Sequence, residues 1–269
     1  MTMVTTKSAA EIAKMRSAGR IVAEVLALVE TELKPGMSTA ELDRLAEKHI
    51  RTSGGTPSFV GYLASSGTYE PANPRSFPAS TCISLDNEVV HGIPGDREIK
   101  AGQVVSVDVG VIFDDWHGDG ARTFICGGPD TVGPAVRKLV DTTRLAMMAG
   151  IAAARPGKRI SDISAAVEDV ALEGGFGIVR GYGGHGIGRD MHEPPHILNY
   201  RDRNREAGMK LQAGHCFAIE PMFTLGMAAT RVMADGWTVV TVDGSRAAHF
   251  EHTIAITREG ARILTTVAD

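Results

Sequence analysis

Five residues of this chain have types and neighbours that could do metal chemistry. Asp108 and Glu220 each end an apolar, strand-like run (VVSVD and CFAIE), and Asp119 lies in GDGARTF just after a turn. His185 is surrounded by glycines in GYGGHGIG, and Glu251 opens EHTIAI. Burying four carboxylates together is too costly in free energy unless cations neutralise them. These residues predict a site for two divalent cations, which in proteins typically serve hydrolysis.

A predicted β-hairpin places the two aspartates near each other. Residues 104–125 read as two strands joined by a turn that begins at Asp114. In that register Asp119 lies opposite Gly110, and Asp108 is its diagonal neighbour on the same face, roughly 7–8 Å away. Two carboxylates so placed can bind one cation from the same side. The alternative, a polar outer face of a half-buried hairpin, does not explain the glycines on both sides of Asp119.

Two further histidines stand in motif-like contexts, His91 in NEVVHGIP and His192 in MHEPP. Either alone would be a core or surface histidine. Beside a metal centre, both would be acid–base or hydrogen-bonding groups for a substrate. The other histidines show no such context and are predicted to be ordinary: His49, His117, His196, His215, His249 and His252.

The composition is that of a soluble globular protein. The chain has 269 residues, 43% of them hydrophobic and 22% charged, which allows one large domain or two small ones. A net charge of −4 gives no reason to expect nucleic acid or a membrane as a partner. Cys82, Cys126 and Cys216 lack any CxxC spacing and the N-terminal segment lacks the apolar core of a signal peptide. We therefore expect reduced cysteines and a cytoplasmic protein.

Four helices are predicted, in two pairs. The sequences SAAE from Ser8 and STAE from Ser38 are capping boxes, which begin helices. Pro134 begins a third helix that runs towards Arg155, and a short fourth helix ends at Gly174.

Motifs of the first half return in the same order in the second half. A Pro-Gly turn before a helix occurs in both, HGIP answers HGIG, and an Ala-Gly pair precedes both VVSVD and CFAIE. The alternative is chance reuse of short turns, because the spacing is not strictly periodic. We expect one catalytic domain over 1–269 made of two related halves, about 10–125 and 134–260, with the ligands at their junction. Residues 63–77 are predicted to form a surface loop, and 200–206 a solvated turn.

Taken together, six segments resemble the motifs of type I methionine aminopeptidases. They are NEVVHGIPG, VSVDVGV, HGDGART, GYGGHGIGRDMHEPP, FAIEPMF and FEHTIAI, and they occur in the family's order over about residues 80–260. The resemblance implies the pita-bread fold, an α/β (α+β) fold with a pseudo-two-fold symmetric antiparallel sheet and helices packed on its outer face. That symmetry agrees with the repeated motifs.

The resemblance also assigns roles to the five ligand residues. It implies that Asp108 binds one metal, that His185 and Glu220 bind the other, and that Asp119 and Glu251 bridge both. Glu220 is then also the proton acceptor in hydrolysis. One imidazole among carboxylates is compatible with Mn, Fe(II), Co or Zn, so the sequence leaves the metal open.

By the same resemblance, the substrate is the N-terminal methionine of nascent proteins and peptides, with a small second residue. His192 would contact the scissile amide and His91 the substrate or the leaving nitrogen. Apolar and polarizable side chains suit a thioether, and the resemblance maps the methionine pocket to Tyr62, Phe77, Cys82, Met191 and Trp237. It further implies a monomer that acts near the ribosome.

Two alternatives stay open. A prolidase-like or aminopeptidase P-like exopeptidase of the same fold would share all five ligands, although the chain before His91 is short for the extra N-terminal domain of those enzymes. A metal-free binding module on this scaffold would have at least one ligand replaced, and none is.

Overall fold

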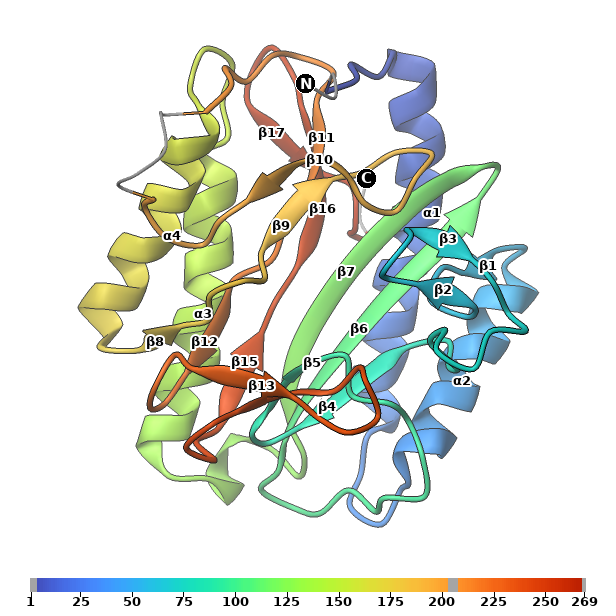
Figure 1. Cartoon of the computed structure of the whole chain (residues 1–269), viewed down its shortest axis with the longest axis vertical. Helices are drawn as coiled ribbons and strands as arrows, with labels where there is room; N and C mark the ends of the chain where they lie inside the picture. The colour runs from blue at the N-terminus through green and yellow to red at the C-terminus, as the bar shows by residue number, and fades with distance from the viewer. Residues whose placement is uncertain (1–3, 203–207, 268–269) are drawn as a thin grey trace.

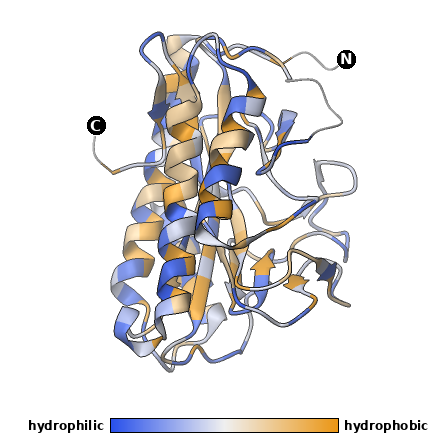
Figure 2. Ribbon diagram, turned by 90° about the vertical axis from the view of Figure 1, so that its left-hand side faces the viewer, coloured by the Kyte–Doolittle hydropathy of each residue, from blue (hydrophilic) through white to orange (hydrophobic). Residues whose placement is uncertain are grey.

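The computed structural model describes residues 4–202 and 208–267, so the predicted turn at 200–206 lies mostly outside the described residues. In this described part of the chain, four α-helices lie on one side of several small antiparallel sheets (Figure 1 and Figure 2). This layering and the antiparallel pairing confirm the predicted fold class. The helices are α1 (Ala9–Glu32), α2 (Thr39–Thr52), α3 (Pro134–Ala153) and α4 (Ile160–Gly174), with one 3₁₀ turn, η1 (Pro129–Thr131). None of the described helices is long and apolar enough to cross a membrane.

The ends of the helices follow from local chemistry. Ser8 and Ser38 each accept a hydrogen bond from the backbone of a glutamate three residues on, and that glutamate bonds back to the cap residue. Both predicted capping boxes are therefore confirmed. Pro134 begins α3, and Gly175 ends α4 in the left-handed conformation that glycine adopts without strain.

The strands fall into five sheets. The first contains β1 (Thr56–Pro57), β4 (Cys82–Leu85), β6 (Val104–Phe113) and β7 (Trp116–Ile125). The second contains β9 (Gly184–Gly186), β10 (Glu193–Ile197), β11 (Cys216–Ile219), β16 (His252–Ile256) and β17 (Ala261–Ile263). The third joins β8 (Gly177–Ile178), β12 (Met222–Thr224) and β15 (Ala247–His249); the fourth joins β5 (Glu88–Val90), β13 (Thr230–Val232) and β14 (Val239–Thr241). The last is the hairpin of β2 (Tyr62–Leu63) and β3 (Thr68–Tyr69).

Each pair of helices covers a different sheet. Helices α1 and α2 pack on β6, where Val105, Val107 and Val109 are fully buried in one apolar cluster with both helices. Helices α3 and α4 pack on β11 and β16 through a second cluster that includes Phe217 and Ile254. Because side chains alternate across a strand, burial of these valines turns Asp108 to the opposite face of the sheet.

The long hairpin has the predicted register. Gly110 pairs with Asp119, and Asp108 pairs with Ala121, so the two aspartates are diagonal neighbours on one face. Gly118 lets this hairpin approach α1 closely, because a Cβ there would lie 2.6 Å from the backbone nitrogen of Gly19.

The segment 63–77 is exposed over most of its length but not at its ends. Tyr69, in the hairpin β2–β3, is 42% exposed, whereas Leu63 and Phe77 are buried. Phe77 belongs to the wall of a cavity, described next.

Candidate active site and metal centre

The predicted ligand residues come from both halves of the chain. Asp108 lies on β6, Asp119 on β7 and His185 on β9, whereas Glu220 directly follows β11 and Glu251 lies between β15 and β16. Strand β11 pairs with β9 on one side and β16 on the other, which brings the ligands of the second half together.

Hydrogen bonds also join β7 to the segment that carries Glu251. The Glu251 N–H donates to the Ala121 carbonyl at 2.9 Å, and the Ala121 N–H donates to the Glu251 carbonyl at 3.2 Å. The Thr253 hydroxyl donates to the Asp119 carbonyl at 2.7 Å and accepts from the Asp119 N–H at 2.9 Å. The main chain itself therefore holds Asp119 beside Glu251.

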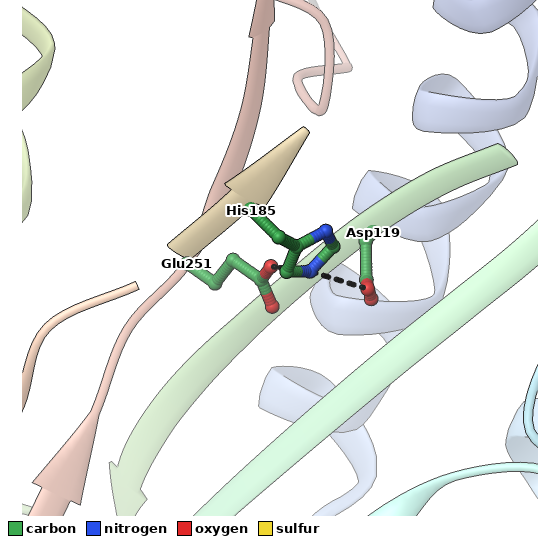
Figure 3. Close-up of side chains that lie close together, drawn as sticks. All are labelled: Asp119, His185 and Glu251. Carbon is green, nitrogen blue, oxygen red and sulfur yellow. Dashed lines mark ion pairs between the residues drawn. The ribbon is translucent and has the colours of Figure 1, made fainter. Parts of the chain in front are cut away.

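The side chains converge on the imidazole of His185. Its Nε2 lies 3.9 Å from Asp119 Oδ2, 3.9 Å from Glu251 Oε1 and 3.7 Å from Glu220 Oε1. Figure 3 shows the imidazole between the carboxylates of Asp119 and Glu251. One ligand atom from each of these three residues lies within 4.8 Å of the others, and all three residues are buried. This spacing is that of groups around a shared metal ion.

The protonation of His185 leaves Nε2 free to bind a metal. Its Nδ1 lies 2.8 Å from the Gly186 carbonyl, which only accepts hydrogen bonds, so Nδ1 carries the proton. Burial lowers the pKa of His185 to about 3, so the ring is neutral at neutral pH. The lone pair of Nε2 then faces carboxylate oxygens, an arrangement that a cation between them would satisfy.

Without cations, the carboxyl groups also lack groups that would stabilise their charged form. Burial, together with the charges of neighbouring carboxylates, raises the pKa of Asp119 and of Glu251 well above the ordinary range. Burial raises the pKa of Asp108 to about 7 and that of Glu220 to about 8. Among the described residues, no hydrogen bond reaches Asp108 Oδ1, Asp119 Oδ1 or Glu251 Oε1. Buried anionic oxygens without donors fit divalent cations.

A cavity of about 520 Å³ opens above the ligands. Its apolar end is a cluster in which Phe77 packs edge-on against Phe59 and Trp237, at ring-centroid distances of 6.1 and 5.2 Å. Every residue that the sequence predicted for the site lines this cavity: Tyr62, Phe77, Cys82, His91, Asp108, Asp119, His185, Met191, His192, Glu220, Trp237 and Glu251.

The two predicted substrate histidines stand on the cavity wall. The Tyr62 hydroxyl lies 2.7 Å from His192 Nδ1, and the His192 ring lies 4.4 Å from that of His185. His91 meets Tyr182 and Trp237 edge to face. Its backbone adopts φ +60°, a left-handed conformation that is uncommon for a residue other than glycine. Burial lowers the pKa of His91 to about 4, so its ring is a neutral hydrogen-bonding group at neutral pH.

Comparison with known proteins agrees with this geometry. Residues 13–258 match metallopeptidase family M24. The methionine aminopeptidase 1 of Mycobacterium tuberculosis is 45% identical over 270 residues, which cover 98% of this chain and 95% of that protein. That of Bacillus subtilis is 42% identical over 98% of this chain and 100% of its own length. The chain belongs to the methionine aminopeptidases of family M24.

Solved structures have the same fold as this chain. A methionine aminopeptidase from Thermotoga maritima superposes with a TM-score of 0.89 at 39% identity, covering 98% of this chain and 100% of the other. The prolidase from Pyrococcus furiosus has a TM-score of 0.75 at 22% identity, and the match covers 98% of this chain but 66% of the prolidase. The prolidase shares the fold. The expected family and the pita-bread architecture are thus confirmed.

Some residues of this site were not predicted from the sequence. Phe59 and Met222 line the cavity, but apolar residues in short strands look alike in sequence whether they face a cavity or the core. His196, predicted to be ordinary, lines it too. His249, also predicted to be ordinary, is 1% exposed, and its Nε2 lies 3.6 Å from Glu220 Oε2. A signal was available, because His249 is two residues before Glu251 in one strand-like run, where alternate residues share a face.

Two histidines predicted to be ordinary, His117 and His252, have hydroxyl partners. His117 Nδ1 lies 3.0 Å from the Ser58 hydroxyl, and His252 Nδ1 lies 2.7 Å from the Thr265 hydroxyl. These contacts account for both side chains without a role in the reaction.

Proposed function

We propose that this protein is a metal-dependent aminopeptidase that removes the N-terminal methionine from polypeptides. One observation carries the proposal: a single cavity joins a buried cluster of unsatisfied carboxylates to an apolar end lined by aromatic, Met and Cys side chains. The cluster supplies a place for hydrolytic metals, and the apolar end suits a methionine thioether.

For the metals, we propose two divalent ions held as the family resemblance implies. Asp108 would hold one ion, His185 and Glu220 would hold the other, and Asp119 and Glu251 would serve both. Bound there, such ions supply Lewis acidity and lower the pKa of water. Oxygen-rich ligands with one imidazole accommodate Mn, Fe(II), Co or Zn.

Glu220 is the ligand best placed to move a proton. Its side chain is 15% exposed to the cavity, against 8% for His185, 4% for Asp119 and 2% for Glu251. Its carboxylate can therefore reach a group in the cavity, whereas Asp119, His185 and Glu251 are more enclosed. We assign it the role of proton acceptor during hydrolysis.

His91 and His192 handle the substrate. His192 is oriented by the Tyr62 hydroxyl and faces the scissile amide, where it can donate to the developing oxyanion. The neutral ring of His91 contacts the leaving nitrogen. The methionine side chain lies among Tyr62, Phe77, Cys82, Met191 and Trp237, and the family resemblance implies a small second residue beyond it.

The test is a metal-stripped protein assayed on Met-Ala-Ser and on an Ala-Pro peptide, with Co, Mn, Fe(II) or Zn restored singly. We expect methionine to be released only after a metal returns. Cleavage of the Ala-Pro peptide instead would move the assignment to proline-directed enzymes of this fold. Glu220→Gln should lose turnover, and Glu259→Gln, on an exposed turn, is the matched control.

We further propose that the protein acts as a monomer in the cytoplasm on nascent chains near the ribosome. Gel filtration tests the monomer, and recovery of unprocessed N-termini in a depleted strain tests the cellular substrate.

A further inference from the structure

His249 is a completely buried histidine that none of the roles above uses. It ends β15, and its side chain is 2% exposed. Its Nε2 has no hydrogen-bond partner among the described residues. A buried polar nitrogen left unpaired is unfavourable, so we expect this imidazole nitrogen to have a partner when the site is complete.

The nearest carboxylate group is a metal ligand of the proposed site. Glu220 Oε1 lies 3.7 Å from Nε2 of His185, and Glu220 Oε2 lies 3.6 Å from Nε2 of His249. The carboxylate thus stands between two imidazoles, with one oxygen towards each. At 3.6 Å the second contact is longer than a hydrogen bond, and a shift of a few tenths of an ångström would close it.

The backbone of His249 is held firmly from β7. The Thr123 hydroxyl donates to the His249 carbonyl at 2.6 Å and accepts from its N–H at 2.9 Å. The Ser106 hydroxyl, on β6, lies 2.8 Å from the Thr123 hydroxyl. Strands β6 and β7 also carry Asp108 and Asp119, so the backbone of His249 is held by the same strands as these ligands. A group supported in this way can orient a ligand accurately.

We infer that His249 is the positioning residue for Glu220. Its Nε2–H donates to Glu220 Oε2, which leaves Oε1 to face the metal shared with His185. The buried Nε2 has no hydrogen-bond partner among the described residues, and Glu220 Oε2 lies 3.6 Å from it, so this carboxylate oxygen is placed to accept its N–H. Outer hydrogen bonds of this kind set ligand orientation, and losing one typically weakens metal binding about 10–100-fold. The inference rests on the proposed metal role of Glu220.

The experiment compares His249→Gln, His249→Asn and His249→Leu. Gln keeps a donor within reach of Glu220, Asn keeps a donor that is too short, and Leu removes the donor. Calorimetric titration of the metal-stripped proteins with Mn²⁺ measures affinity without any substrate. We expect Gln to bind within about threefold of the parent, and Asn and Leu to bind about 10–100-fold more weakly. At saturating Mn²⁺, kcat of Asn and Leu should fall while KM for Met-Ala-Ser stays unchanged.

His215→Leu is the matched control, because His215 is also buried, at 2% exposed, but bonds to the Gln212 N–H away from the cavity. It should bind Mn²⁺ like the parent. Equal affinity of the Gln and Asn variants would overturn the inference, and this comparison stands even if the Leu variant does not fold. If the parent binds Mn²⁺ tightly but releases no methionine, the proposed function fails while the comparison of affinities still tests His249.

Discussion

The metal-free protein should become less stable as the pH rises from about 6.5 to 8. In the metal-free protein, burial raises the pKa of Glu220 to about 8, of Asp108 to about 7, and of Asp119 and Glu251 well above their ordinary range. These groups keep their protons in the fold at a pH where the unfolded chain has lost them. The folded state therefore binds more protons, and the free energy of unfolding falls with rising pH.

The window is chosen so that the histidines do not interfere. Burial lowers the pKa of His185 to about 3 and that of His91 to about 4, so below about pH 6.5 they give the opposite slope. Above it the carboxyl groups act alone. One pH unit is worth about 1.4 kcal/mol per proton, so Glu220 by itself accounts for about 2 kcal/mol between pH 6.5 and 8. That corresponds to a fall in Tm of roughly 4–8 °C for a protein of this size.

The assay is thermal unfolding of the chelator-treated protein at half-unit pH steps, with and without excess Mn²⁺. Bound metal requires the carboxylates to be deprotonated in the fold, so the metal-loaded protein should lack the decline. Glu220→Gln should make the decline of the metal-free protein less steep, with Asp119 and Glu251 still contributing, whereas Glu259→Gln should leave the decline unchanged. A metal-free Tm that stays level or rises over this window would refute the account of the buried carboxyl groups.

Three further results are expected. Asp119→Ala should abolish Mn²⁺ loading together with turnover, and full metal occupancy in that variant, measured by elemental analysis, would contradict its bridging role. Tyr62→Phe removes the hydroxyl 2.7 Å from His192 Nδ1, and kcat/KM for Met-Ala-Ser should fall about 2–10-fold while Mn²⁺ affinity stays the same. Gly118→Ala would put a Cβ 2.6 Å from the backbone of Gly19 and should lower stability by about 1–3 kcal/mol in urea unfolding, whereas Gly95→Ala, with open space around it, should not.

The parts of the fold that sequence predicted are those set by local chemistry. The capping residues Ser8 and Ser38 begin helices because their side chains satisfy the exposed N–H groups of the first turn. The hairpin register followed from a two-residue turn and the alternation of side chains, which together place Asp119 opposite Gly110. The duplication of the two halves stays a prediction.

The parts that sequence did not predict depend on contacts between distant segments. His249 looked ordinary because its neighbour Glu220 follows a different strand, β11, and no local pattern pairs them. The wall of the cavity is similar: Trp237 Nε1 donates to the Arg75 carbonyl across 162 positions of the chain. Such contacts depend on how the sheets pack against one another, and neither the alternation of side chains along strands nor helix capping determines that packing.

The geometry of the metal centre is set by the fold more than by the metals. Two backbone hydrogen bonds join Glu251 to Ala121, and the Thr253 hydroxyl is hydrogen-bonded to the Asp119 main chain. These bonds hold the carboxyl groups of Asp119 and Glu251 close together whether or not a cation is bound. The metal-free protein therefore keeps these carboxyl groups close at the cost of their raised pKa values. A site held in this way binds divalent cations with little rearrangement, since its ligands are already close together in the free protein. Weakening the hydrogen bonds between Thr253 and the Asp119 main chain, without removing a ligand, should therefore weaken Mn²⁺ binding measured by calorimetric titration.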